Sequence, residues 1–225
     1  MTAELLLEVS KSFLFVIAAV LPILNPAATA PIFLGLTQGA SRQTRESLAR
    51  RIARNMFALM VGSMLVGSYV LEFFGISLPI VRVGGGLVVA AAAWQLLNAH
   101  DASDERRTAL AESFTPEHAR RRAFYPLTFP ISCGPGSIAA AITVGVALND
   151  ARFSISLARM GGGVLALLVI AVLLYFAFRY AEQLLRPLGE AGSVIFLRLS
   201  AFILLCLGVQ IVWDGASELL RSLLA

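Results

Sequence analysis

The stretch Pro22-Ile-Leu-Asn-Pro26-Ala-Ala-Thr-Ala-Pro31 lies inside a long apolar run and decides how the chain folds. A proline lacks the amide hydrogen that a helix needs, and its ring crowds the carbonyl one turn earlier. The residue before a proline is also pushed out of the α region. The three prolines therefore predict a helix that breaks over residues 25–30. A second helical arm is expected to begin near Pro31, because proline suits the first turn of a helix.

The same proline spacing occurs again in Pro126-Leu-Thr-Phe-Pro130-Ile-Ser-Cys-Gly-Pro135. In both stretches three residues separate the first two prolines and four separate the second two. Matched breaks in two apolar segments are typical of secondary transporters built from internal repeats. The alternative is that the prolines only kink helices whose gaps are filled by neighbouring helices.

The composition places the whole chain in a membrane. Of its 225 residues 58% are hydrophobic and 14% are charged, whereas a soluble domain carries about 25% charged residues. Each charge-free interval is near or above the roughly 17–25 apolar residues that span a bilayer. The sequence thus predicts an all-α membrane protein with six transmembrane helices. The intervals without Asp, Glu, Lys or Arg are residues 12–41, 55–71, 83–100, 123–149, 160–178 and 199–213.

The basic residues predict the orientation in the membrane. Five of the 18 Lys and Arg residues fall on the side that holds both termini, and 13 fall on the other side. Because cytoplasmic loops are enriched in Lys and Arg, both termini are expected to be periplasmic. The net charge of +4 comes mostly from arginines in the loops, which set this orientation, so no nucleic-acid partner is expected. The acidic start of the chain does not match a signal peptide, and the first segment is expected to be retained.

The two halves of the chain are expected to be structural repeats. Ser-Leu-Ala-Arg occurs at residues 47–50 and again at 156–159, before the second and fifth spans. Arg82 and Arg198 open the third and sixth spans. Because three spans are an odd number, the two copies must lie in opposite orientations in the membrane.

The expected domain organisation is a single transmembrane domain over residues 1–225. Repeat one covers about 10–99, a cytoplasmic linker about 100–122 and repeat two about 123–216. The first and fourth helices are expected to be discontinuous. The first arm of the first helix, residues 12–24, would cover only about 20 Å of a hydrocarbon core of roughly 30 Å.

The breaks form the predicted substrate site. A helix interrupted in hydrocarbon leaves amides and carbonyls without partners, at a cost of several kcal/mol each. Free amides attract an anion and free carbonyls attract a cation, and an α-amino acid carries both charges on one small frame. The side chains near the breaks are small and uncharged, which favours a small ligand without net charge. The residues expected at the site are Asn25, Pro26, Ala27, Ala28, Thr29 and Ala30 in the first break, and Thr128, Ser132, Cys133, Gly134, Pro135, Gly136 and Ser137 in the second.

Other functions are weighed against transport. An intramembrane hydrolase needs a nucleophile with a histidine or paired carboxylates inside the spans, and the spans offer only Cys133 and hydroxyls, so no enzyme activity is expected. His100, Asp101 and His118 lack the spacing of a metal site, and no metal or other cofactor is expected. No carboxylate lies mid-span, which does not favour a proton relay. Coupling to Na⁺ or H⁺ and the oligomeric state stay open, as does a channel function.

These residues resemble the MarC-related membrane proteins, a family that includes the SnatA small neutral amino acid transporters. The resemblance rests on Leu24-Asn-Pro26 followed by Pro31-Ile-Phe33, and on Pro126-Leu-Thr-Phe-Pro130 followed by Gly134-Pro-Gly136. It implies inverted three-helix repeats with discontinuous first and fourth helices in the bacterial inner membrane.

The resemblance further implies transport of glycine, alanine and similar amino acids by alternating access, coupled to a cation gradient. The alternative is a channel, or an exporter for another small polar solute. Many members of the family carry Gly and Asn where this chain has Ala28 and Thr29. The substrate range is therefore expected to differ from that of those relatives.

Overall fold

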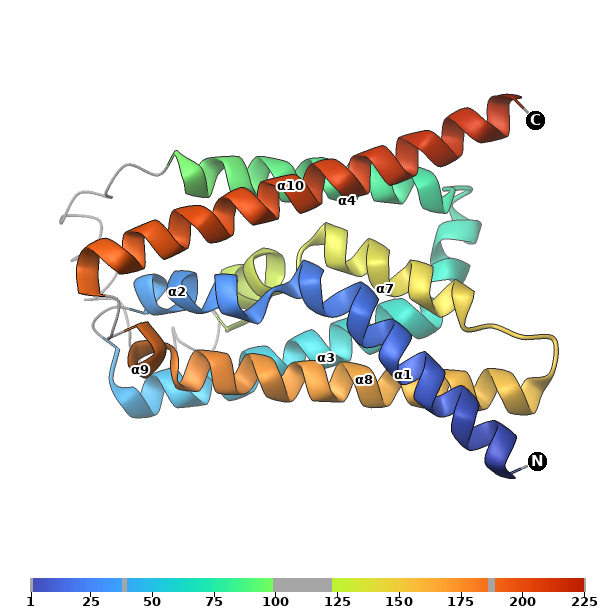
Figure 1. The fold of residues 1–225 in the computed structure, drawn as a ribbon, viewed down its shortest axis with the longest axis horizontal. Helices are drawn as coiled ribbons and strands as arrows, with labels where there is room; N and C mark the ends of the chain where they lie inside the picture. Colours follow the sequence, from blue (N-terminus) through green and yellow to red (C-terminus); the bar gives the residue numbers. More distant parts are fainter. Residues whose placement is uncertain (1, 38–39, 99–122, 186–188, 225) are drawn as a thin grey trace.

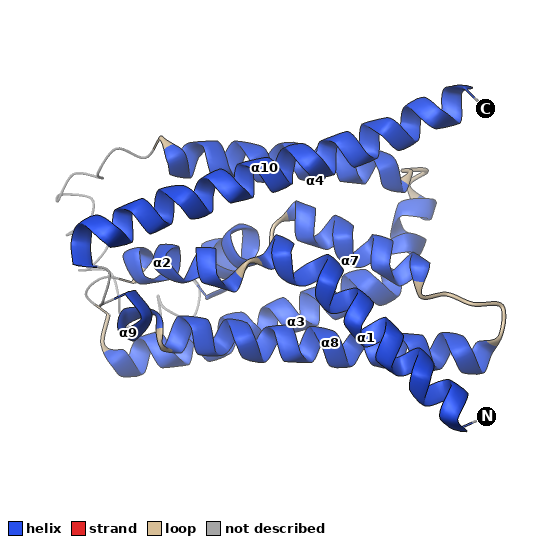
Figure 2. Cartoon of the chain, in the orientation of Figure 1, coloured by secondary structure: helices blue, strands red, loops and turns tan. Residues whose placement is uncertain are grey.

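The architecture comes from a computed structural model that describes residues 2–37, 40–98, 123–185 and 189–224 (Figure 1). Every regular element in these ranges is helical, which confirms the all-α class (Figure 2). The predicted linker, residues 100–122, lies outside the described residues, as do His100, Asp101 and His118. The elements in chain order are α1 (Thr2–Leu24), α2 (Pro26–Leu36), α3 (Arg42–Phe73), α4 (Leu78–Leu97), η1 (Ala123–Ser132), α7 (Pro135–Ala147), α8 (Phe153–Arg179), α9 (Ala181–Leu185) and α10 (Gly189–Leu224).

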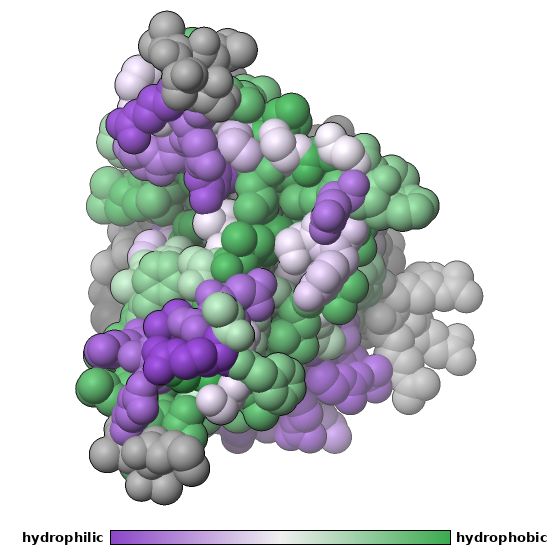
Figure 3. Space-filling model, turned by 90° about the vertical axis from the view of Figure 1, so that its right-hand side faces the viewer, coloured by the Kyte–Doolittle hydropathy of each residue, from purple (hydrophilic) through white to green (hydrophobic). Residues whose placement is uncertain are grey.

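The helices have the length and composition of a membrane protein. Within the described residues, four segments are long and apolar enough to cross a bilayer, and two shorter helical segments are also apolar. The sequence predicted six spans; four of them are candidate spans by length and composition, and six crossings stay a prediction. Viewed from the end that carries both termini, the molecule shows clusters of hydrophilic side chains on that end face (Figure 3). The four long segments are Glu4–Leu34, Arg42–Phe73, Phe153–Arg179 and Ala201–Arg221, and the two shorter ones are Leu78–Ala91 and Pro135–Ala147.

The helices lie in three layers (Figure 1). α4 and α10 pack against each other as one outer layer, and α3 and α8 pack as the other. The middle layer contains α2, η1 and α7, and α1 crosses from it onto α8. Both helix breaks therefore lie in the middle layer, between the two outer pairs.

The main hydrophobic core joins the middle layer to α3 and α8. Its large buried side chains include Phe33, which stacks on Phe178 with ring centroids 4.5 Å apart. No described residue of α4 or α10 belongs to this core. These two helices instead pack through small residues: a Cβ on Gly208 would lie 2.6 Å from the Ala90 nitrogen. Such close backbone approach is how membrane helices gain van der Waals contact. We call this pair the α4–α10 panel.

The first helix break is shorter than the sequence predicted. α1 ends at Leu24 and α2 begins at Pro26, so Asn25 alone separates them. The prediction of a break over residues 25–30 with a restart near Pro31 is wrong, because Pro31 lies inside α2. The residues between Pro26 and Pro31 are Ala-Ala-Thr-Ala, and alanine is the strongest helix former. A proline at this position removes one hydrogen bond but does not end the helix.

The first arm is also longer than predicted. α1 begins at Thr2 and has 23 residues, or about 35 Å at 1.5 Å per residue. The prediction that this arm begins at residue 12 is therefore wrong. That it is too short to span alone stays a prediction, because the candidate span, Glu4–Leu34, also includes α2. Its charged first turns are held by partners from α8 and the preceding loop: Glu8 pairs with Arg159 at 2.6 Å, and Glu4 with Arg152 at 3.3 Å.

Candidate functional site

A cavity of about 340 Å³ lies where the two helix breaks meet the α4–α10 panel. Ligand pockets range over roughly 300–1,000 Å³, so this cavity suits a small ligand. Residues from both breaks form its polar part, and apolar side chains form the rest. None of the described residues that line it carries a charge.

At the first break Asn25 caps α2. Its backbone lies in the left-handed region with φ of 40°, which Asn tolerates better than most residues. The side-chain Oδ1 accepts the N–H of Ala28 at 3.2 Å, and the Asn25 carbonyl accepts the N–H of Thr29 at 3.1 Å. The side-chain amide nitrogen has no acceptor in the described part of the chain, so it is a donor available to a ligand.

At the end of α1 the carbonyls of Ile23 and Leu24 are free. Neither receives a backbone N–H from any described residue, because the chain turns at Asn25 and the N–H of Ala28 bonds to Asn25 instead. Both residues line the cavity. A carbonyl without an N–H partner is a site for a cation or a hydrogen-bond donor.

The second break is built from wide turns in η1. Tyr125 (φ −117°, ψ 125°) and Phe129 (φ −115°, ψ 126°) are extended, and each directly precedes a proline, as expected from the proline ring. Hydroxyls then satisfy carbonyls five residues back: Thr128 donates to Ala123 at 2.5 Å, and Ser132 donates to Leu127 at 2.7 Å. These two hydroxyls are therefore committed to the backbone.

The start of α7 offers free amides to the cavity. Gly134 is its N-cap residue (φ −92°, ψ 177°) and has no side chain with which to cap it, and Pro135 follows. The N–H groups of Gly136 and Ser137 have no acceptor among the described residues. Gly134, Pro135 and Ser137 all line the cavity. The free N–H of Ser137 and the positive end of the helix dipole thus belong to the same cavity wall as Asn25, and the free N–H of Gly136 lies next to this wall.

A family model described as MarC family integral membrane protein matches residues 10–220. The chain belongs to the MarC family. Among its relatives are the inner membrane protein MarC of Escherichia coli K12 and that of Shigella flexneri. Each is 29% identical over 223 residues, which cover 96% of this chain and 99% of the relative. No solved structure matches the chain.

The family assignment confirms the resemblance seen in the sequence and makes the chain an integral membrane protein. The structure brings seven of the thirteen predicted site residues of this MarC-family chain to the cavity wall, and their role in binding stays a prediction. The seven are Asn25, Ala28, Thr29, Ser132, Gly134, Pro135 and Ser137.

The other six predicted residues lie around the cavity without lining it. Ala27 is exposed, and Ala30 belongs to the main core. Cys133 is fully buried with its sulfur 3.4 Å from that of Met60. Gly136 faces α4, where a Cβ would lie 2.5 Å from the Val89 side chain. The remaining two are Pro26 and Thr128.

Sequence reasoning did not identify the wall that the panel contributes. Val88 and Val89 of α4 and Ala201 and Leu204 of α10 line the cavity opposite the breaks. Apolar residues in charge-free spans carry no polar signal that would single them out. Gly85 of α4 does carry a sequence signal, because a glycine inside a span indicates close helix packing. In the structure a Cβ at this position would lie 3.1 Å from the Pro135 carbonyl.

Proposed function

We propose that this MarC-family protein is a secondary transporter of small neutral amino acids, such as glycine and alanine, in the bacterial inner membrane. The observation that carries the proposal is that both helix breaks line one uncharged cavity. The amides of Gly136 and Ser137 suit the substrate carboxylate, and the carbonyls of Ile23 and Leu24 suit its ammonium group.

The cavity walls also suit a small apolar side chain. Ala28, Val89 and Ala201 present only methyl groups to the space. The Thr29 hydroxyl donates to the Asn25 carbonyl at 3.2 Å, so its hydrogen is already used within the protein. The absence of charge from this wall disfavours acidic and basic amino acids, because a buried unpaired charge is costly.

Alternating access would come from movement of the α4–α10 panel against the rest of the molecule. The panel lies outside the main core and contributes one wall of the cavity. The contacts support two inverted repeats. α1 of the first half packs on α8 of the second, and correspondingly η1 and α7 of the second half pack on α3 of the first. In the same way α2 contacts α10, and α7 contacts α4. In carriers of this plan one repeat-derived unit rocks against the other around a fixed site.

At the end that carries both termini the panel is tied to α7. Arg82 of α4 forms an ion pair with Glu218 of α10, and its Nε donates to the Thr143 hydroxyl of α7 at 3.3 Å. The bond to Thr143 would have to break when the cavity opens toward this end. Arg198, which the sequence pairs with Arg82, is exposed, so the two arginines have different surroundings.

Uptake into liposomes tests the function. Purified protein should show saturable uptake of labelled glycine or alanine. Unlabelled neutral amino acids should inhibit this uptake, whereas lysine and glutamate should not. Protein-free liposomes are the control. Absence of uptake, together with no thermal shift from neutral amino acids, would contradict the proposal, and a conductance too fast for a carrier would support a channel instead.

Orientation is tested by labelling. We propose that both termini are periplasmic, from the bias of basic residues. In a Cys133→Ser/Cys206→Ser background, single cysteines are placed at Thr2, Leu110 or Leu224. An impermeant maleimide added to spheroplasts should label positions 2 and 224 but not 110; the reverse pattern would contradict the proposed orientation.

A further inference from the structure

A second hollow, of about 370 Å³, lies between α3 and α8 at the end opposite both termini. Its floor is made by two small side chains, Ala53 of α3 and Ala171 of α8, which are 7% and 6% exposed. Phe57, Leu168 and Val172 form its sides. The hollow therefore lies over a part of the α3–α8 contact where both helices carry an alanine.

Two arginines stand at the mouth of this hollow. Arg50 and Arg54 are four residues apart, so they lie on the same face of α3, and both are exposed. Arg54 has no partner among the described residues. The one described partner of Arg50 is Glu46, at 3.7 Å, and Glu46 is shared with Arg179 at 3.1 Å. Two arginines therefore share one carboxylate and Arg54 has none among the described residues, so the mouth has an excess of positive charge.

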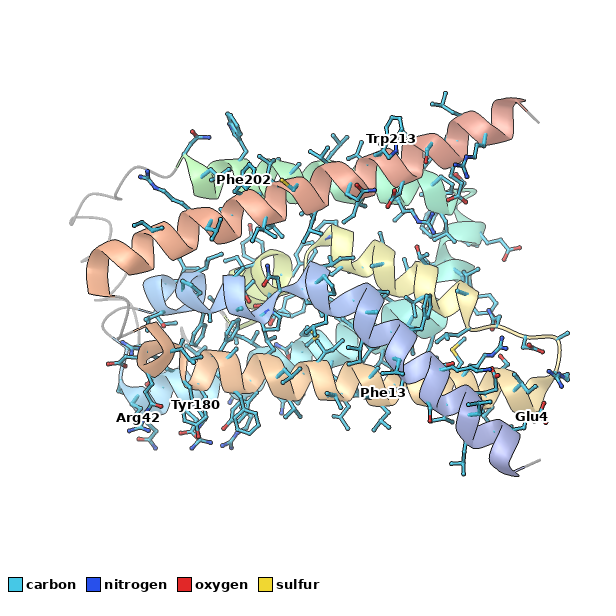
Figure 4. All side chains as sticks on the ribbon, in the orientation of Figure 1. Glu4, Phe13, Arg42, Tyr180, Phe202 and Trp213 are labelled. Atoms are coloured by element: carbon cyan, nitrogen blue, oxygen red, sulfur yellow. The ribbon has the colours of Figure 1, made fainter. Side chains whose placement is uncertain are left out.

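The arginines lie at the boundary of the membrane. Arg54 directly precedes the charge-free interval that starts at residue 55. Arg179 lies over the rings of Tyr175 and Tyr180, at 5.7 and 5.6 Å from their centroids, in the manner of an interfacial aromatic belt. Tyr180 lies at the same end of the molecule as Arg42, at the start of α3 (Figure 4). The mouth thus sits at headgroup depth, and the apolar floor continues into the hydrocarbon.

We propose that this hollow binds an anionic diacyl phospholipid, with the phosphate against Arg50 and Arg54 and one acyl chain along the Ala53–Ala171 floor. Arginine matches phosphate geometry with two parallel hydrogen bonds, and basic pockets between membrane helices bind anionic headgroups. A zwitterionic lipid lacks the net charge to use both arginines. The proposal does not depend on the transported substrate.

Native mass spectrometry of the detergent-purified protein tests the proposal. The protein is titrated with phosphatidylglycerol and with phosphatidylcholine of the same acyl chains. Wild-type protein should retain one phosphatidylglycerol in preference to phosphatidylcholine. Arg50→Gln/Arg54→Gln should lower phosphatidylglycerol retention by roughly tenfold or more, because each interfacial arginine strengthens anionic-lipid binding several-fold. Phosphatidylcholine retention should not change.

The matched control is Arg42→Gln/Arg51→Gln, which removes two charges from the same helix outside the hollow. Arg42 and Arg51 have no ion-pair partner among the described residues. It should retain phosphatidylglycerol as the wild type does. Equal loss in both double variants would overturn the site, because charge attraction would then be diffuse. Displacement by glycerol phosphate would show a simple phosphate site, and dissociation of a dimer by the first variant would show a second copy in the hollow; either result overturns the proposal.

Discussion

The break between α1 and α2 and the break between η1 and α7 share their proline spacing but differ in structure. In the first, the helix restarts at the second proline, Pro26, after one non-helical residue. In the second, it restarts at the third, Pro135, after extended residues before each of the first two. The segments between the second and third prolines are Ala-Ala-Thr-Ala and Ile-Ser-Cys-Gly. Alanine favours an immediate restart, whereas Ser, Cys and Gly do not.

The difference teaches that prolines set where a helix cannot continue, and the residues between them set where it begins again. It also divides the chemistry of the site. Asn25 satisfies the Ala28 amide of α2 with its own side chain, whereas Gly134 leaves the amides of α7 free. The second break is therefore the expected carboxylate site, and the first supplies carbonyls for the ammonium end. The Asn25 side-chain amide nitrogen is a donor and adds to the groups that can bind the carboxylate.

The largest effect on uptake is expected from substitutions at the starts of α2 and α7, the helices that follow the two breaks. Gly136 and Ala27 each follow the proline that starts α7 or α2, but Gly136 packs on Val89 and Ala27 is exposed. Gly136→Val should abolish alanine uptake and lower stability by about 1–3 kcal/mol, because the side chain would push α7 from α4. Ala27→Val should keep more than half of the uptake rate.

Initial uptake rates, normalised to monodisperse protein, measure this difference. Thermal unfolding in detergent shows whether Gly136→Val still folds. Equal tolerance of valine at both positions would show that the breaks do not differ in packing as described.

The next effect concerns the left-handed residue of the first break. Asn25→Ala should lower stability by about 2–3 kcal/mol, since alanine adds about 1–2 kcal/mol of strain at positive φ and loses a cap of about 1 kcal/mol. Asn25→Gly should cost only a few tenths of a kcal/mol, because glycine accepts this backbone. Both variants lose the amide donor, so both should bind alanine more weakly. Unfolding curves and a binding titration separate the backbone role from the side-chain role, and similar stability of the two variants would argue against strain at this residue.

The smallest expected effect comes from giving the second break the cap of the first. Gly134→Asn places a side chain that can accept the amides of Gly136 or Ser137, and the extended backbone at this residue permits it. Stability should rise by roughly a few tenths of a kcal/mol, while the KM for alanine should rise by roughly tenfold because the cap competes with the carboxylate. Gly134→Ala, which adds no acceptor, is the control. An unchanged KM in Gly134→Asn would place the carboxylate elsewhere.

Much of this arrangement follows from local sequence, and the failures have a common cause. The charge-free runs and prolines predicted the all-α membrane class and that the chain breaks after Leu24 and again before Pro135, but not that α2 restarts at Pro26. The extent of α1 was missed because Glu8 is paired with Arg159, a partner 151 residues away along the chain. The wall formed by Val88 and Ala201 was missed because only the packing of the panel gives these apolar residues their place.

A structure determined with bound alanine tests the central claim, that both breaks hold one substrate, most directly. The account predicts alanine in the cavity between the breaks and the panel. Its carboxylate should lie within hydrogen-bond distance of the Gly136 and Ser137 amides, and its ammonium group should face the carbonyls of Ile23 and Leu24. Alanine bound away from either break, with those amides bonded to other groups, would contradict it.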